Sequence, residues 1–151
     1  MDIELVTAAD GELIDNGLLQ IRIIEDGSNT GHRLGITEVR LGPAAAGPPQ
    51  HLHRSHEETF YVVSGRVRFT SGQRHADLTA GGLVTAPIGV PHTFANPDTE
   101  RGAVLLVTYT PDRYIGYFRD MARLDCGVDG LHESAYLELM SRYDTEPFPP
   151  R

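Results

Sequence analysis

Four side chains in the middle of the sequence have the types and the spacing of a metal site. His51 and His53 are two residues apart, and side chains so spaced in a strand point to the same face, where their imidazoles can share a cation. Glu58 opens the next strand-like run, and His92 opens a later one. Three imidazoles and a carboxylate suit a divalent Fe, Mn, Ni, Co, Cu or Zn ion and suit Ca or Mg poorly. The pattern predicts one such ion per chain.

Two further polar residues, His56 and Glu57, lie between His53 and Glu58. They could support the candidate ligands from behind or stand at the mouth of the site. The other interpretation, which we favour at this point, is a solvated loop between His53 and Glu58.

The composition excludes several other kinds of reactive site. The chain has 13 basic residues, all of them arginine, 21 acidic residues and one cysteine, Cys126. A lysine Schiff base, a disulfide within the chain and a zinc site of several thiolates are therefore excluded. With no amine and one thiol available, the metal is the best candidate for the reactive centre.

The net charge and the hydropathy pattern limit the classes of partner that we expect the protein to bind. A net charge of −8 argues against binding nucleic acid or an anionic membrane through bulk electrostatics. The longest aliphatic run, residues 103–107, is too short to cross a bilayer. The first four residues lack the basic region of a signal peptide, and one free cysteine fits a reducing compartment. We expect a cytoplasmic protein with a small-molecule substrate.

Short runs of alternating or β-branched residues, separated by turn residues, predict an all-β body. The predicted strands are residues 18–24, 34–41, 59–63, 66–70, 74–78, 83–86, 92–96 and 103–110. Eight short strands indicate a sandwich or a barrel in a chain long enough for one domain.

The last quarter has helical spacing instead. Thr110 and Pro111 are a suitable N-cap and first helical residue, and Gly127 is a suitable stop. A second helix is predicted over residues 131–143. We expect residues 1–111 to form the barrel and residues 112–151 to form a helical extension, packed on the barrel or on a partner subunit. Tyr114, Phe118 and Tyr136 are expected to serve packing.

Two motifs in this sequence resemble those of the cupins, a superfamily of small β-barrels. Their first motif pairs two histidines with a later glutamate and a glycine, and their second runs from a glycine through a proline, a glycine and a histidine to an asparagine. The first motif is matched by His51, His53, Glu58 and Gly65, and the second by Gly81, Pro87, Gly89, His92 and Asn96. One departure is Ala45, where the first motif usually begins with glycine.

The resemblance implies a jelly-roll barrel with one or two C-terminal α-helices, a metal held by His51, His53, Glu58 and His92, and a homodimer. Strand alternation then predicts which side chains point into the barrel. The predicted pocket residues are Val39, Leu41, Phe60, Val62, Phe69 and Phe94. Such a cavity is mostly apolar, as small-molecule sites usually are, and no arginine is predicted to point inward.

The chain is also similar to single-domain bacterial cupins of the quercetin dioxygenase type. This similarity implies a metal-dependent oxidoreductase that acts on a small phenolic or enolic molecule, with Glu58 as both ligand and general base. Two alternatives stay open because cupins serve many functions. One is a metal-dependent isomerase, cyclase, lyase or decarboxylase that needs no O2, and the other is a non-catalytic small-molecule-binding protein.

Overall fold

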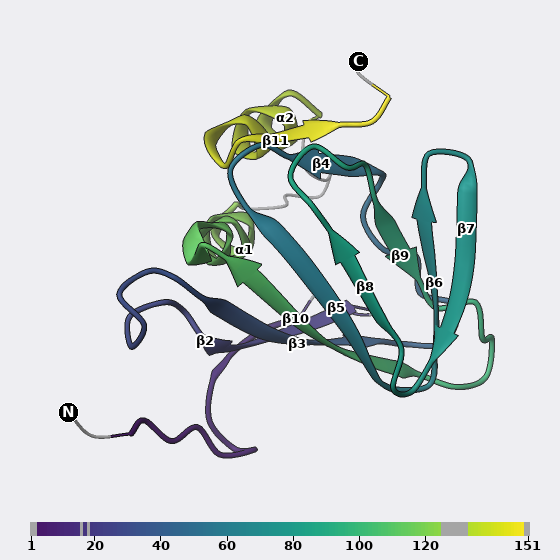
Figure 1. Ribbon diagram of the computed structural model, residues 1–151, viewed down its shortest axis with the longest axis horizontal. Coiled ribbons are helices and arrows are strands. Elements are labelled where there is room, and N and C mark those ends of the chain that lie inside the picture. The colour runs from purple at the N-terminus through teal and green to yellow at the C-terminus, as the bar shows by residue number, and fades with distance from the viewer. Residues whose placement is uncertain (1–2, 16, 18, 125–132, 150–151) are drawn as a thin grey trace.

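The computed structural model of the protein describes residues 3–15, 17, 19–124 and 133–149, and strands dominate it (Figure 1). The strands are β1 Glu12–Asp15, β2 Leu19–Glu25, β3 Gly35–Leu41, β4 His51–His53, β5 Glu57–Ser64, β6 Arg66–Ser71, β7 Arg74–Thr79, β8 Leu83–Ala86, β9 Thr93–Ala95, β10 Ala103–Thr110 and β11 Thr145–Pro147. A 3-10 turn, Asp112–Tyr114, leads into α1, Ile115–Arg123, and α2 follows at Glu133–Arg142.

Alternating apolar residues place one face of each central strand in the core. In β10, Ala103, Leu105, Val107 and Tyr109 are buried, while the residues between them are partly exposed. This two-residue period is what a half-buried strand produces. The eight strands expected from such patterns are confirmed.

The strands form an antiparallel jelly roll, as expected. A six-stranded sheet has the order β1-β2-β3-β10-β5-β8, and a three-stranded sheet has the order β7-β6-β9. Figure 1 shows β6, β7 and β9 together on one side of the molecule, with α1 and α2 stacked near β4 and β11. The pair β4 and β11 forms a separate two-stranded ladder.

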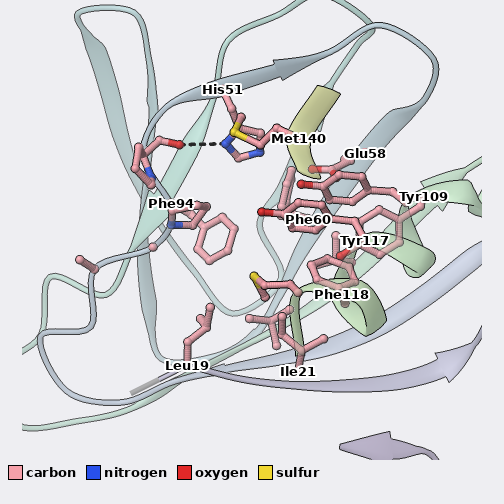
Figure 2. Close-up of a pocket in the computed structure, with 18 of the residues that line it drawn as sticks. Leu19, Ile21, His51, Glu58, Phe60, Phe94, Tyr109, Tyr117, Phe118 and Met140 are labelled. Atoms are coloured by element: carbon pink, nitrogen blue, oxygen red, sulfur yellow. Dashed lines mark hydrogen bonds between the residues drawn. The ribbon is translucent and has the colours of Figure 1, made fainter. Parts of the chain in front are cut away.

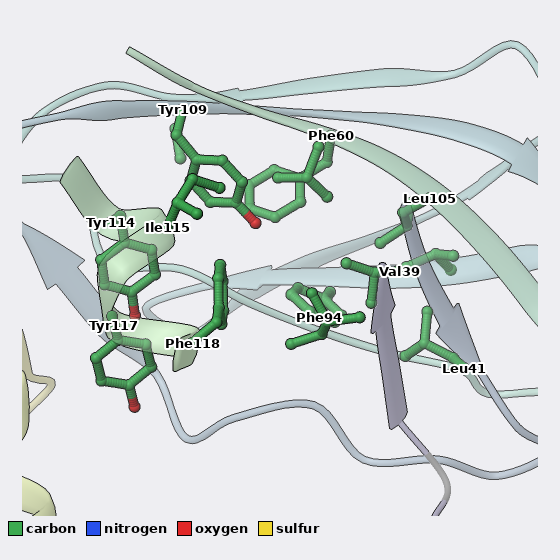
Figure 3. Close-up of a cluster of buried hydrophobic side chains, with 14 of the residues drawn as sticks. Val39, Leu41, Phe60, Phe94, Leu105, Tyr109, Tyr114, Ile115, Tyr117 and Phe118 are labelled. Atoms are coloured by element: carbon green, nitrogen blue, oxygen red, sulfur yellow. The ribbon is translucent and has the colours of Figure 1, made fainter. Parts of the chain in front are cut away.

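One hydrophobic cluster joins the barrel to the C-terminal segment (Figure 3). Val39, Leu105 and Phe60 belong to it from the barrel strands, and Ile115 and Phe118 from α1. Ile115 is 1% exposed and Leu139 of α2 is fully buried. The helices therefore complete the core, which explains why an extension with many apolar residues stays attached to the barrel.

Gly65 makes the turn from β5 to β6 and needs to be glycine. Its φ is +77°, and a Cβ atom there would lie 2.6 Å from the carbonyl oxygen of Gly102. The left-handed conformation and the close approach both disfavour any side chain. Ala45, where the motif usually has glycine, is buried without a positive φ, so its methyl group is accommodated.

The start of the first helix differs from the prediction. Thr110 does not cap it, because it remains the last residue of β10, paired with Glu57. The 3-10 turn follows Pro111 with no side-chain cap, and α1 begins at Ile115. The predicted stop at Gly127, the start of the second helix at residue 131 and Cys126 lie outside the described residues.

Three strands were not among the eight predicted ranges. Of these, β1 pairs with β2, and β4 pairs with β11. The sequence does not predict a strand at β11, because Pro147, Pro149 and Pro150 indicate only a non-helical tail. Its three residues are held by β4 and not by their own propensity.

Several apolar side chains stay exposed on the outer face of the large sheet, among them Tyr61, Val63 and Leu83. Homodimer formation stays a prediction. Among the described residues, no helix has the length and apolarity that crossing a bilayer requires.

Candidate metal centre

The backbone brings His92 directly opposite His51. The His51 amide donates to the His92 carbonyl oxygen at 3.2 Å, and the His92 amide donates back to the His51 carbonyl oxygen at 2.9 Å. This isolated antiparallel bridge joins β4 to the residue just before β9. Two segments 41 positions apart in sequence thereby present imidazoles to one point.

The three histidines form a tight buried triangle. The ring centroids of His51 and His53 are 4.9 Å apart, those of His51 and His92 are 4.8 Å apart, and those of His53 and His92 are 5.2 Å apart. Each side chain offers a nitrogen atom within 4.8 Å of the other two. One cation could therefore contact all three.

Glu58 reaches the same point from β5. It is paired with Tyr109 of β10 on one side and with Ala86 of β8 on the other, so its strand is held at both edges. Its Oε1 lies 3.2 Å from the Nε2 of His53, and its Oε2 lies 3.1 Å from the Nε2 of His92. The carboxylate, 3% exposed, thus completes the mixed nitrogen and oxygen set.

Two of the rings have their outer nitrogen fixed by a nearby carbonyl. The Nδ1 of His51 donates to the Pro49 carbonyl oxygen at 2.8 Å, and the Nδ1 of His92 donates to the Val90 carbonyl oxygen at 2.9 Å. A carbonyl only accepts, so these Nδ1 atoms carry hydrogen. Their Nε2 atoms are the ones turned toward the centre, as metal-binding histidines require.

The Nε2 atom of His53 indicates whether these residues suit a cation. The Nε2 of His53 is buried and makes no hydrogen bond to any described residue, although Glu58 Oε1 lies 3.2 Å away. Such an unpaired group costs about 1–3 kcal/mol. A divalent transition ion would take its lone pair, so the donor set fits the predicted metal.

The pKa values follow from burial and from the shared carboxylate. Burial, and then the nearby His92, lowers the pKa of His51 to about 4. Burial also lowers the pKa of His53. For His92 the effect of burial is outweighed by the hydrogen bond to Glu58, and its pKa is raised. Burial opposes ionisation of Glu58, but the surrounding imidazoles hold its pKa well below its ordinary value.

His56 is buried, and the solvated-loop interpretation is wrong for it. The side chain is 1% exposed, and its Nε2 lies 3.2 Å from Glu58 Oε1. Its ring stacks on Tyr114 with centroids 4.6 Å apart. His56 is two residues before Glu58, so strand alternation was a signal that could have placed it beside the carboxylate. Glu57 is exposed at the start of β5.

A cavity of about 460 Å³ opens beside the imidazoles (Figure 2). Its lining includes His51 and Glu58 and otherwise consists mostly of apolar and aromatic side chains. The lining residues are Leu19, Ile21, Val39, Ala46, Gly47, Pro48, Pro49, His51, Glu58, Phe60, Phe94, Val107, Tyr109, Tyr114, Tyr117, Phe118, Met121, Tyr136 and Met140.

The structure places three of the six predicted pocket residues, Val39, Phe60 and Phe94, on this wall. The other three are core residues away from the wall: Leu41, Val62 and Phe69. Alternation gives the face of a strand but not the position along it: Leu41 and Val62 lie farther along their strands than Val39 and Phe60 do, and no residue of β6, which carries Phe69, lines the cavity.

Aromatic residues of the C-terminal segment form much of the remaining wall. Tyr114, Phe118 and Tyr136, which were expected to serve packing, all line the cavity, and so does Tyr117. Figure 2 shows Tyr117 and Phe118 on the side of the cavity opposite His51. This role could not be predicted from the sequence, because helical spacing identifies a buried face without identifying what that face contacts.

Comparison with known proteins supports the architecture. The model of the cupin domain family matches residues 37–109, and no curated protein sequence matches the chain. An RmlC-like cupin from Shewanella frigidimarina is similar in structure, with a TM-score of 0.61 and 25% identity over 73% of this chain and 92% of that one.

Two other solved structures share the fold at lower identity. A predicted oxalate decarboxylase from Thermotoga maritima has a TM-score of 0.63 and 16% identity, over 72% of this chain and 99% of that one. The polyketide cyclase RemF from Streptomyces resistomycificus has a TM-score of 0.62 and 22% identity, over 72% of this chain and 80% of that one. The family match over residues 37–109, together with the jelly roll, identifies that part of the chain as a cupin domain.

Proposed function

We propose that this cupin is a metal-dependent oxidoreductase of the dioxygenase type that acts on a small phenolic or enolic molecule. The observation that carries the proposal is that His51, one member of the imidazole triangle, and Glu58 both line an apolar cavity of about 460 Å³. That volume lies within the range of small-molecule sites. The group expected to react is at the wall, and the rest of the wall can hold an apolar substrate.

His51, His53 and His92 would hold the ion through Nε2, and Glu58 would hold it through a carboxylate oxygen. When bound, a first-row ion supplies Lewis acidity and, if it is redox-active, one-electron chemistry. All four ligand side chains are buried, so bulk water is kept from the centre.

The chain's own residues indicate the kind of substrate. Among the described residues that line the cavity, Glu58 is the one acid and no arginine is present, so an anionic substrate would lack a guanidinium partner. Phe60, Phe94 and Tyr117 offer ring faces and edges to an aromatic molecule. A neutral phenol or enol is the substrate that this wall suits.

Glu58 is placed to accept the hydroxyl proton of such a substrate. Its lowered pKa keeps it ionised at neutral pH, and it lines the cavity. His56 contacts Oε1 and would hold the carboxylate in place during the transfer.

This proton transfer needs no oxygen, and it also favours the second candidate, a metal-dependent isomerase, cyclase, lyase or decarboxylase. The experiment is an oxygen-electrode assay of protein loaded with each candidate metal, given catechol or 3-hydroxyflavone as probes. Metal-dependent O2 uptake matched to substrate loss supports the dioxygenase. Turnover of the same probes under strict anaerobiosis rejects it in favour of the second candidate.

Binding of the probes without turnover under either condition would indicate the third function, a non-catalytic binding protein. Glu58→Gln is the informative variant, because it removes the proton acceptor with little change of shape. We expect it to abolish turnover while probe binding persists. The matched control is Glu57→Gln, which changes an exposed neighbour and should leave turnover unchanged.

A further inference from the structure

The strand that carries two of the candidate ligands is held by the end of the chain. β11 pairs antiparallel with β4, so that Thr145 lies opposite His53 and Pro147 lies opposite His51. Asp144, with a φ of +51°, turns the chain from the end of α2 into this strand. Thr145 is 3% exposed. A residue 92 positions away is thereby buried against a candidate metal ligand.

The hydrogen bonds of Thr145 define which nitrogen of His53 carries the proton. The Thr145 hydroxyl donates its one hydrogen to the Tyr143 carbonyl oxygen at 3.1 Å. Its oxygen also lies 2.8 Å from His53 Nδ1, and with its hydrogen already used it can only accept there. The Nδ1 of His53 is therefore the donor, and in the neutral ring Nε2 holds the lone pair that a cation needs.

His53 differs from the other two histidines in the source of this support. His51 and His92 donate to carbonyl oxygens two residues before them, so the neighbouring backbone supplies their partners. Packing also fixes the His53 ring, with the His56 and Tyr114 rings 4.0 and 4.6 Å away between centroids. Such ring contacts can hold an orientation, but they do not select a tautomer.

We propose that Thr145 is a positioning residue that sets the tautomer of His53, which makes the C-terminal strand a working part of the metal site. This inference rests on the metal centre proposed above. A histidine that is oriented by an outer hydrogen bond typically loses about 10- to 100-fold in metal affinity when that partner is removed. The expected effect of Thr145 is of that size.

The experiment compares Thr145→Val, which keeps the shape and removes the hydroxyl, with Thr145→Ser, which keeps the hydroxyl. Zn2+ and Co2+ affinities are measured by competition with a chromophoric chelator. Thr145→Val should weaken binding by about 10- to 100-fold, and Thr145→Ser should restore most of the loss. Glu146→Gln is the matched control, because it changes the same strand at an exposed side chain and should bind as the unaltered protein does.

A second measurement needs no metal. In the metal-free protein at pH 8, nitrogen NMR of labelled histidine should show His53 protonated at Nδ1 in the unaltered protein and in Thr145→Ser, and a mixture of tautomers in Thr145→Val. Protonation at Nε2 in the unaltered protein overturns the inference, as does full metal affinity in Thr145→Val. Correct tautomers in a protein that binds neither ion would instead reject the metal centre.

Discussion

The barrel and the C-terminal segment contribute different chemistry to one cavity. The barrel supplies the ionisable groups, which are His51, His53, Glu58 and His92 with His56 behind them. The C-terminal segment supplies aromatic and thioether side chains, among them Tyr117, Phe118, Met121, Tyr136 and Met140. The difference teaches that the proposed ligands and proton acceptor come from the barrel alone, whereas both regions contribute to the apolar wall, to which the barrel adds Phe60 and Phe94.

The tyrosines of the C-terminal segment do not add an ionised group to the cavity at neutral pH. Burial, followed by the neighbouring Tyr117, raises the pKa of Tyr114 well above its ordinary value, and burial likewise raises that of Tyr117. Both phenols therefore stay protonated at neutral pH. They can shape the cavity and donate hydrogen bonds, while Glu58 remains the proposed proton acceptor.

The largest effect should come from removing a barrel ligand. His53→Ala deletes one of three imidazoles, so the affinity for Zn2+ or Co2+ should fall by more than the roughly 100-fold that loss of a mere outer partner can cause. The fold should survive, because the hydrophobic cluster that joins barrel and helices does not include His53. Metal stoichiometry by elemental analysis and the melting temperature of the metal-free protein measure the two outcomes.

His75→Ala is the matched control for this change, since His75 is exposed on β7. It should retain one metal per chain. Full stoichiometry in His53→Ala would remove the chemical role assigned to the barrel side of the cavity.

Acid should weaken metal binding in a graded way. Metal needs neutral imidazoles, so protons compete with it. The pKa of His92 is raised, whereas that of His51 is lowered to about 4, so His92 is the first to take a proton as the pH falls. Affinity should therefore drop by about tenfold per pH unit, starting above the ordinary histidine pKa of about 6.5. A chelator competition series from pH 8 to pH 5 measures the slope.

The raised pKa of His92 also determines how this residue's contribution to folding stability changes with pH. Because the pKa of His92 is higher in the folded metal-free protein than in the unfolded chain, its contribution to stability is present at low pH and is lost as the pH rises through the folded value.

The prediction for metal binding is that His92 takes up a proton before His51 does. A drop of several orders of magnitude in metal affinity over one pH unit would contradict it, since so steep a drop requires the imidazoles to protonate together.

The barrel side was the predictable side, for a physical reason. His51, His53 and Glu58 are close in sequence, and strand alternation puts the two histidines on one face, while the spacing of the second motif adds His92. The bounds of β8 and β10 also agree with the predicted ranges. Local rules suffice where a strand and its turn decide the geometry.

The C-terminal side was predictable only as helix. β11 has three residues and exists through its pairing with β4, and no local pattern announces a partner more than 90 residues away. The contact from Thr145 to His53 is therefore invisible in the sequence. The lining role of Tyr136 is invisible for the same reason, because it depends on where α2 docks.

A change in the C-terminal wall should alter ligand binding and leave the metal in place. Met121 lines the cavity from α1 and is partly buried. Met121→Ala removes about three heavy atoms of apolar surface, which should change the affinity for 3-hydroxyflavone by about 3- to 30-fold. Calorimetry on the metal-loaded protein measures it, with the metal affinity of the same variant as the second readout.

Val63→Ala serves as the control for Met121→Ala, since it shortens an exposed apolar side chain outside the cavity. It should change neither the affinity for 3-hydroxyflavone nor the metal affinity. A large loss of metal affinity in Met121→Ala would show that the two sides are not separable.

The smallest effect should come from the exposed ion pair of Arg54 and Glu146, which joins the barrel to the C-terminal segment. Arg54, the residue after β4, and Glu146 of β11 form two hydrogen bonds, of 3.0 and 2.8 Å, but both side chains are about half exposed. Water and salt screen such a pair, so Glu146→Gln should leave the free energy of unfolding nearly unchanged, with a smaller difference still at high salt. Urea unfolding at two ionic strengths measures this difference.

The comparison with the buried contact beside it gives this small effect its meaning. Thr145 and Glu146 are adjacent on β11; Thr145 contacts His53 of β4 inside the fold, and Glu146 contacts Arg54, just after β4, on its surface. If Glu146→Gln weakened metal binding as much as Thr145→Val, the strand would act by general tethering, and the tautomer of His53 would not be the cause. If only Thr145→Val does so, the two regions meet functionally at one hydrogen bond.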